Sequence, residues 1–151
     1  YFGLMLTPKG PKVIEYNCRF GDPETQVVLP LLESDLLTIM QSVTNGTLDK
    51  CEVNFSKKSA ACVVMASSGY PQKYESGFEL KIDDSVKDSV YVAGAKLENN
   101  ILKTAGGRVL GVTAVGDNLN DAISNAYQKV SKVEFGNAFY RKDIGAKALK
   151  A

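Results

Sequence analysis

The spacing of apolar residues near the start of the chain predicts a hairpin. Residues 2–6 and 13–18 have the composition and patterning of strands. The turn-rich segment 7–12 lies between them, so we expect a hairpin whose loop is longer than two residues.

Two helices are expected next. Asp22 is a suitable N-cap, Pro23 suits the first helical position, and Pro30 stops this short helix. Ser34 can cap a second helix that ends at Asn45 and Gly46. Its apolar residues recur at i, i+3, i+4 and i+7, which predicts one core-facing side: Leu36, Ile39, Met40 and Val43.

A strand-rich segment follows a polar, unpatterned stretch. Turns that accept positive φ are expected at Asn99–Asn100 and at Gly106–Gly107. Asp117 or Asn118 caps a helix with one apolar face, and residues 138–140 form a last short strand. The other expected strands are residues 60–66, 77–82, 90–97, 101–104 and 109–115.

These elements predict an α+β protein in two lobes. We assign residues 1–46 to the first lobe, residues 47–59 to a linker, and residues 60–151 to a small second lobe with one helix. The chain opens with Tyr1, directly on an apolar run, so we expect it to be part of a longer protein.

Composition excludes several classes of protein. The 18 Lys and Arg nearly cancel the 17 Asp and Glu, so the basic footprint of a non-specific nucleic-acid binder is missing. The longest apolar run, residues 60–66, is far shorter than the ~20 residues of a membrane span, and no signal pattern opens the chain. We therefore expect a cytoplasmic protein that binds neither nucleic acid nor membrane.

The absence of histidine excludes Ser-His-Asp and Cys-His catalysis as well as His-ligated zinc. The three cysteines form no C-x-x-C motif, which argues against a disulfide framework and a thiolate zinc site. Cys18 and Cys62 lie in apolar contexts and are interpreted as small buried residues.

Polar residues on the second predicted strand form the first candidate site. Alternation places Glu15, Asn17 and Arg19 on one face. A carboxylate and an amide about 7 Å apart along a strand offer hard oxygen ligands that can hold one Mg²⁺ together, and Mn²⁺ accepts the same ligands. Arg19 could grip a phosphate or carboxylate. The alternative is a solvent-facing strand with ordinary polar residues.

The second candidate site is the loop of residues 19–24, which runs into a helix N-terminus and so offers free N–H groups to an anion. The alternative is a simple turn before a capped helix. Together, the two contiguous candidates supply what phosphoryl transfer requires, namely positioning and charge neutralisation. Gly106, Gly107 and Arg108 lack the spacing and Lys of a P-loop and are interpreted as a hairpin turn.

Five blocks of residues share one resemblance. They are residues 15–26, residues 63–66 with 69–71, residues 93–94, residues 106–110 with 112–114, and residues 141–145. In this order they resemble glycinamide ribonucleotide synthetase, also called phosphoribosylamine–glycine ligase. One departure is Val92, where the family commonly has a histidine, so this position is given no catalytic part.

The resemblance implies the C-terminal third of an ATP-grasp ligase of purine synthesis. The family enzyme uses ATP to phosphorylate glycine, and 5-phosphoribosylamine then displaces the phosphate. By this resemblance Glu15 and Asn17 match the Mg²⁺ ligands that bridge the ATP phosphates. Arg19, the catalytic candidate, matches with Gly21 and Asp22 the wall that faces the acyl phosphate and the phosphoribosylamine. The family often forms part of a multifunctional purine enzyme.

The resemblance also implies missing partners. The ATP-grasp lobe that clamps the nucleotide and the N-terminal domain of the family have no counterpart in this sequence, so we expect the chain alone to be inactive. Two alternatives stay open: another ATP-grasp ligase, such as a biotin carboxylase relative, and a non-catalytic interaction module that kept the fold. Retention of Glu15, Asn17, Arg19 and Asp22 together disfavours the module.

Overall fold

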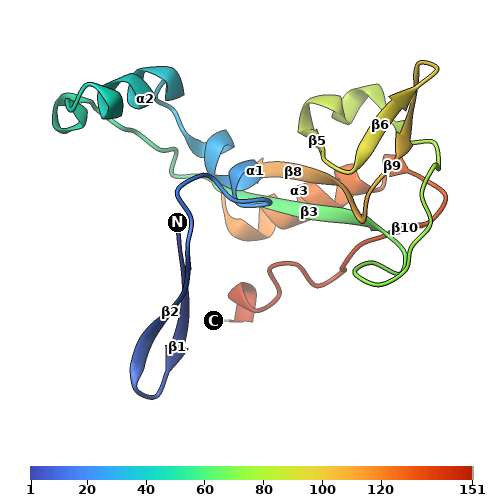
Figure 1. Cartoon of the computed structure of the whole chain (residues 1–151), viewed down its shortest axis with the longest axis horizontal. Helices are drawn as coiled ribbons and strands as arrows, with labels where there is room; N and C mark the ends of the chain where they lie inside the picture. Colours follow the sequence, from blue (N-terminus) through green and yellow to red (C-terminus); the bar gives the residue numbers. More distant parts are fainter. Residues whose placement is uncertain (151) are drawn as a thin grey trace.

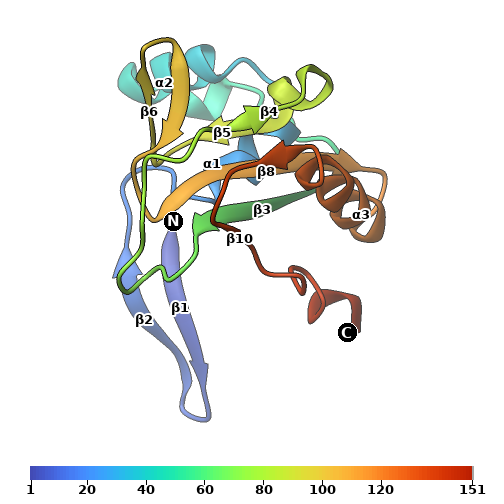
Figure 2. The same ribbon diagram turned by 90° about the vertical axis from the view of Figure 1, so that its right-hand side faces the viewer.

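The computed structural model describes residues 1–150 and confirms the predicted α+β class. A four-stranded antiparallel sheet forms its centre, with the strand order β10 (Ala138–Phe139), β3 (Ser59–Ser67), β8 (Arg108–Gly116) and β5 (Val90–Val92). The hairpin of β1 (Phe2–Thr7) and β2 (Gly10–Tyr16) projects away from this sheet, and the arm that carries α2 (Leu36–Thr44) projects in another direction (Figure 1, Figure 2). Among the described residues, no helix has the length and apolar character required to cross a membrane.

The predicted hairpin forms with a tighter turn than expected. Strands β1 (Phe2–Thr7) and β2 (Gly10–Tyr16) pair from Phe2 opposite Tyr16 to Thr7 opposite Gly10, so only Pro8 and Lys9 remain in the loop. The Thr7 hydroxyl donates to the Gly10 carbonyl at 2.7 Å and accepts from the Lys9 N–H at 3.2 Å. Gly10 adopts φ +91°, which closes the turn. The prediction of a longer loop was wrong.

The first helical segment starts later than predicted. Helix α1 (Thr25–Val28) continues into the 3₁₀ turn η1 (Leu29–Leu31), and its N-cap is Glu24, with no side-chain cap. The Asp22 cap was therefore a wrong prediction, because the Asp22 carboxylate bonds to other side chains instead. The Gly21 carbonyl accepts from the Thr25 N–H at 3.0 Å and also from the Thr25 hydroxyl.

The cap and the environment of the second helix both differ from the prediction. Helix α2 (Leu36–Thr44) is capped by Asp35, whose carboxylate accepts from the Thr38 N–H at 2.7 Å. Ser34 instead accepts from the Asn54 N–H at 2.8 Å. No residue of α2 is buried, so its apolar side does not face the core of the described chain. The helix ends as predicted at Asn45, and Gly46 has φ +67°.

The core lies between the central sheet and α3 (Leu119–Val130). Strands β3 (Ser59–Ser67) and β8 (Arg108–Gly116) pair antiparallel, with Val63 opposite Val112. Both side chains are buried on the face that α3 covers, together with Met65, Leu110, Ala122, Ala126 and Val130. As predicted, Asn118 caps α3: its side-chain Oδ1 accepts from the Asp121 N–H at 3.0 Å. The short helix α1 also contacts these two strands.

Of the remaining strands, β7 (Ile101–Thr104) has its predicted bounds, β9 (Val133–Glu134) was not predicted, and the others are shorter than the sequence pattern predicts. The expected strand of residues 90–97 is split, because the N–H groups of Ala93 and Gly94 both donate to the Val109 carbonyl. The turn of Asn99 and Asn100 forms as predicted, with φ of 52° and 62°. The other strands are β4 (Lys81–Ile82), β5 (Val90–Val92), β6 (Ala95–Glu98), β7 (Ile101–Thr104), β9 (Val133–Glu134) and β10 (Ala138–Phe139). Further 3₁₀ turns are η2 (Leu48–Lys50), η3 (Asp84–Ser89) and η4 (Ala148–Lys150).

Candidate functional site

The first candidate cluster lies at the open end of the hairpin. Glu15 is exposed on β2, and its Oε1 accepts from the Tyr1 hydroxyl at 3.1 Å. This bond raises the pKa of the Tyr1 phenol above its ordinary value; partial desolvation and the charges of Glu15 and Glu24 add to the rise, and a hydrogen bond with Arg19 opposes it. The Tyr1 hydroxyl therefore lies between the two charged side chains that the sequence singled out.

Asn17 follows directly after β2 and pairs with Tyr1 through its backbone, which adds one residue pair to the open end of the hairpin. Its backbone N–H donates to the Tyr1 carbonyl at 2.8 Å, and its carbonyl accepts from the Tyr1 nitrogen at 2.7 Å. The side-chain Nδ2 of Asn17 is buried without a hydrogen-bond partner in residues 1–150. This amide lines a hollow of about 460 Å³, whose other walls come from Tyr1, Cys18, Arg19, Phe20 and Met40.

Arg19 is exposed at the rim of the same hollow. Its Nη1 donates to the Phe20 carbonyl at 3.1 Å, which turns the guanidinium back toward the loop that follows. That hydrogen bond uses one of the five N–H donors of the group. Arg19 is therefore suited to bind an anion that enters the hollow, as the sequence predicts, and the structure brings it together with Asn17.

Gly21 and Asp22 lie between the hollow and the central sheet. Gly21 is buried, and a Cβ built on it would overlap the Glu24 carboxylate and the Tyr1 ring, so a larger residue here would have to displace those two side chains. The two oxygens of Asp22 have separate partners: Gln26 Nε2 donates to Oδ1 at 2.7 Å, and Arg108 Nη2 lies 3.4 Å from Oδ2. Asp22 therefore orders the loop through its side chain.

The donor chemistry of Glu15 and Asn17 fits a hard divalent cation. The carboxylate of Glu15 and the side-chain amide of Asn17 each carry an oxygen that such a cation accepts as a ligand. The described residues contain no group of three or more His, Cys, Asp or Glu side chains that could enclose a metal ion. Glu15 and Asn17 could therefore hold only a cation whose other ligands come from phosphates and water. Mg²⁺ is commonly bound in this way.

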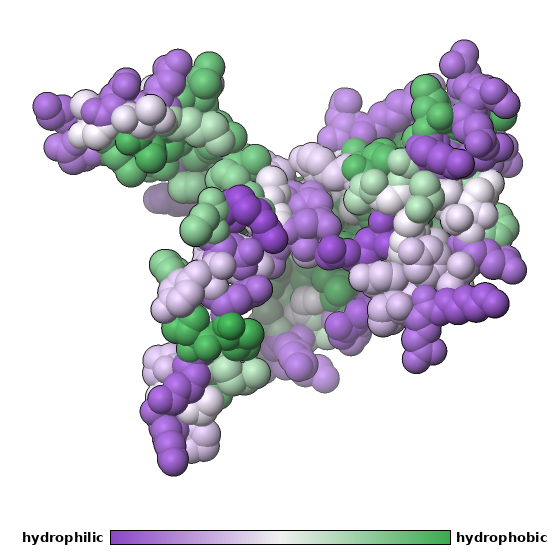
Figure 3. Space-filling view, viewed as in Figure 1, coloured by the Kyte–Doolittle hydropathy of each residue, from purple (hydrophilic) through white to green (hydrophobic). Residues whose placement is uncertain are grey.

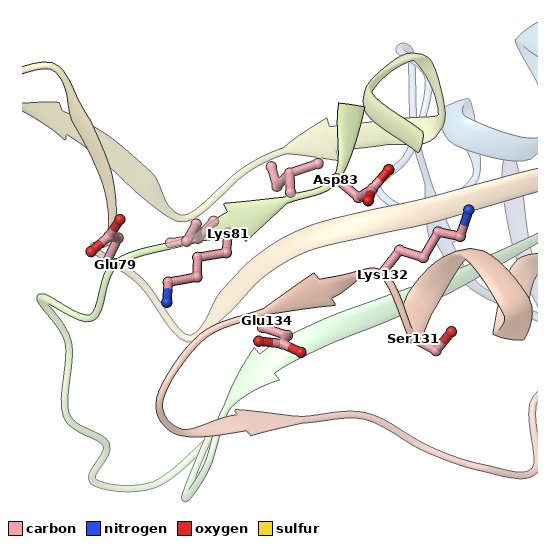
Figure 4. Close-up of a pocket in the computed structure, with 8 residues that line it drawn as sticks. Glu79, Lys81, Asp83, Ser131, Lys132 and Glu134 are labelled. Carbon is pink, nitrogen blue, oxygen red and sulfur yellow. The ribbon is translucent and has the colours of Figure 1, made fainter. Parts of the chain in front are cut away.

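A second hollow, of about 600 Å³, lies between β4 and β9 (Figure 4). Its walls carry Glu79, Lys81, Asp83, Lys132 and Glu134, so charges of opposite sign alternate around it. None of the residues predicted from the sequence lies here. Because the charges of the two signs cancel over short distances, this surface shows no preference for one sign of ligand.

Two family models match the chain in the order of its elements. The model "Phosphoribosylglycinamide synthetase, C domain" matches residues 60–147. The chain belongs to the phosphoribosylglycinamide synthetase family. The model "Phosphoribosylglycinamide synthetase, ATP-grasp (A) domain" matches residues 1–25, which include Glu15, Asn17 and Arg19. These matches confirm the resemblance noted in the sequence and favour this family over the biotin carboxylases.

Relatives of the family cover nearly all of this chain. A phosphoribosylamine–glycine ligase of Caldanaerobacter subterraneus subsp. tengcongensis is 46% identical over 97% of the chain, and the chain spans 35% of that protein. The human trifunctional purine biosynthetic protein adenosine-3 is 46% identical over 99% of the chain, which spans 15% of it. The crystal structure of a phosphoribosylamine–glycine ligase from Thermotoga maritima superimposes with a TM-score of 0.76 at 32% identity, over 95% of this chain and 36% of that one.

Three residues of this region were missed by sequence reasoning. Tyr1 bonds to Glu15, Met40 reaches the hollow from α2, and Arg108 reaches Asp22 from β8. Tyr1 and Met40 carry no local signal, because their roles depend on tertiary contacts. Arg108 did have a signal, since it lies inside the block of residues 106–110, but it was interpreted as part of a turn.

Proposed function

We propose that the chain is the C-terminal part of a phosphoribosylamine–glycine ligase of purine synthesis. Residues 1–46 end its ATP-grasp core, residues 47–59 form a linker, and residues 60–151 form the small C-terminal domain. The observation that carries the proposal is the cluster at the open end of the hairpin, where Asn17 and Arg19 line one hollow beside Glu15 in a chain of this family. The name of a relative that is 46% identical to the chain and the matches of the two family models also support the proposal.

The proposed site has two parts with different tasks. Glu15 and Asn17 would hold Mg²⁺ against the phosphates of ATP, where the cation neutralises charge during phosphoryl transfer. Arg19 faces the anion that forms, and its planar guanidinium suits the oxygens of an acyl phosphate. Gly21 and Asp22 shape the wall on the phosphoribosylamine side.

The proposed reaction proceeds in two balanced steps. A carboxylate oxygen of glycine attacks the γ-phosphorus of ATP, ADP leaves, and glycyl phosphate is formed. The amine of 5-phosphoribosylamine then attacks the carbonyl carbon, the C–O bond to phosphate breaks, and the nitrogen loses a proton. Glycinamide ribonucleotide, ADP and phosphate result. The side chains of this chain contribute positioning and charge, which supply most of the catalysis in such transfers.

Exposed apolar surface supports the proposed link to an upstream ATP-grasp domain. One face of the hairpin carries large apolar side chains in the open: Leu6 is 84% exposed, Phe2 69% and Tyr16 67%. Leu37 and Val43 on α2 are 62% and 58% exposed. Apolar side chains gather on the hairpin and along α2 (Figure 3). A two-stranded hairpin is marginal alone, so these surfaces suit contact with the rest of a larger domain.

The decisive experiment compares the full-length parent with this chain. ADP release is measured with ATP and Mg²⁺, first with both glycine and 5-phosphoribosylamine, then with each omitted. The parent should release ADP only when glycine is present and should form glycinamide ribonucleotide only with both substrates. The 151-residue chain should fold, as judged by a cooperative thermal transition, and release none. Activity absent from the parent would favour the non-catalytic module.

A further inference from the structure

One contact joins the loop of the proposed site to the central sheet. Arg108 Nη1 donates to the backbone carbonyl of Asp22 at 3.1 Å, and Arg108 Nη2 lies 3.4 Å from Asp22 Oδ2. The two residues are 86 positions apart in the chain. Two separate nitrogens therefore hold two separate oxygens of one residue, which fixes both the backbone and the side chain of Asp22.

The backbone that carries Arg108 is itself held firmly. The buried Ser67 makes two hydrogen bonds to the turn that precedes Arg108. The Ser67 N–H donates to the Gly107 carbonyl at 2.8 Å, and the Ser67 hydroxyl donates to the Gly106 carbonyl at 3.0 Å. A Cβ at Gly107 would overlap the Tyr70 ring, so the turn packs directly against this aromatic side chain. The backbone from which the Arg108 side chain extends, at the beginning of β8, is therefore well fixed.

We propose that Arg108 is a positioning residue that latches the loop of Gly21 and Asp22 onto the C-terminal domain and so sets the wall for the phosphoribosylamine. The inference deepens the proposed function and rests on it for the identity of the substrate. Arg108 acts through Asp22: its two bonds set the position of the loop, and the loop continues into Arg19 on one side and α1 on the other. The sheet of the C-terminal domain thereby fixes the geometry of one wall of the site.

The latch serves geometry more than stability. The Arg108 and Asp22 side chains are 46% and 48% exposed, and an ion pair this exposed adds little to the free energy of folding. Its loss should leave the fold intact and free the loop. A loop displaced by about 1 Å can lower a rate by about two orders of magnitude in a site that depends on positioning.

Cys62 offers a probe of the latch that does not depend on activity. It lies on β3 opposite Thr113, and α1, which follows the loop, contacts both of these strands. Burial raises the pKa of its thiol, the nearby charge of Asp22 adds to that rise, and a hydrogen bond with Thr113 opposes it. When the loop lifts, Asp22 and its charge move away from the thiol, so Cys62 should react faster with an alkylating reagent.

The kinetic test uses Arg108→Gln, Arg108→Lys, Asp22→Asn and the double variant Arg108→Gln/Asp22→Asn in the full-length parent. Arg108→Gln should raise KM for 5-phosphoribosylamine by up to about 100-fold, the loss that a displaced wall can cause, with KM for ATP nearly unchanged. Arg108→Lys keeps the charge but lacks the fork, so it should restore part of the loss. Because Arg108 acts through Asp22, the double variant should lose less than the product of the two single losses.

The matched control is Lys58→Gln. It removes the Lys58–Asp117 ion pair, whose atoms lie 3.5 Å apart at the opposite end of the same two strands. This variant should keep wild-type kinetics. Iodoacetamide labelling of Cys62, followed by peptide mass spectrometry, should speed up severalfold in Arg108→Gln and stay unchanged in Lys58→Gln.

Three results would overturn the inference. Kinetics and labelling of Arg108→Gln equal to those of Lys58→Gln would show that the contact positions nothing. Faster labelling of Cys62 in Arg108→Gln with an unchanged KM for 5-phosphoribosylamine would show that the loop moves without affecting this substrate. A loss in the double variant equal to the product of the two single losses would show that Arg108 does not act through Asp22. If the wild-type parent itself lacks ligase activity, the proposed function fails, while unchanged labelling of Cys62 would still refute the latch by itself.

Discussion

The Glu15→Gln substitution separates the charge of the proposed metal ligand from its shape. Glu15 is exposed at the open end of the hairpin, and its Oε1 accepts from the Tyr1 hydroxyl at 3.1 Å. Glutamine keeps an oxygen that can accept this bond, so the pairing of β1 and β2 should persist. An exposed substitution of this kind usually changes the free energy of unfolding by no more than about 0.5 kcal/mol. The melting temperature of the parent without nucleotide should therefore hardly move.

Activity should respond far more strongly than stability. Glu15 supplies the only full negative charge of the proposed pair, since Asn17 contributes a neutral amide. Removing one preorganised electrostatic contact costs roughly 100-fold or more in the catalysed step, which corresponds to about 2.7 kcal/mol of transition-state stabilisation. The Mg²⁺ concentration needed for half-maximal rate should also rise, because a neutral ligand binds a hard cation more weakly.

The assay is glycine-dependent ADP release by the full-length parent over a Mg²⁺ titration, with thermal unfolding measured on the same samples. The control is Glu52→Gln, which makes the same chemical change at an exposed position in the predicted linker and should be silent. Near-normal turnover and an unchanged Mg²⁺ requirement in Glu15→Gln would refute the metal assignment. Glu15 would then be an ordinary polar residue of an exposed strand.

Three further predictions concern the fold. Asn118→Ala should destabilise the parent by about 1 kcal/mol in urea unfolding, because the N-cap of α3 is lost, and Asn118→Ser, which keeps a capping oxygen, should lose less. Leu110→Ala should cost about 2–5 kcal/mol in the same assay, since Leu110 is buried between β8 and α3; a cost below about 1 kcal/mol would contradict this packing. Alkylation of Cys62 should rise with pH along a curve displaced above that of a free thiol, because burial raises its pKa; a midpoint at or below that of free cysteine would disagree.

Local chemistry determined much of the fold in advance. The pairing partners β3 and β8, strand β7, and the Asn99–Asn100 turn were all predicted within one residue. Helix α3 and its Asn118 cap followed from side-chain spacing and from a capping bond that spans three residues. Such signals depend on neighbours a few positions away, so sequence alone carries them.

Competition between partners decided what the sequence left open. Asp22 is as good a local cap as Asp35, yet its carboxylate bonds to Gln26 and Arg108 and leaves α1 uncapped by a side chain. The strand predicted over residues 90–97 breaks where two N–H groups turn to the Val109 carbonyl. In both places a group far along the chain takes part in the bond, Arg108 at Asp22 and Val109 at residues 93–94, and no pattern along the chain reveals which distant group is within reach.

The candidate site also has properties that the sequence determines and properties that only tertiary contacts determine. The sequence by itself determined which residues can bind a cation or an anion, because a carboxylate, an amide and a guanidinium carry that chemistry wherever they lie. Only the tertiary structure decided their surroundings. Tyr1 lies beside Glu15, and Met40 lines the hollow. Arg108, which is 86 positions away in the sequence, bonds to Asp22. These contacts depend on how the hairpin and the sheet come together in three dimensions, a geometry set by burial over the whole chain rather than by any one segment.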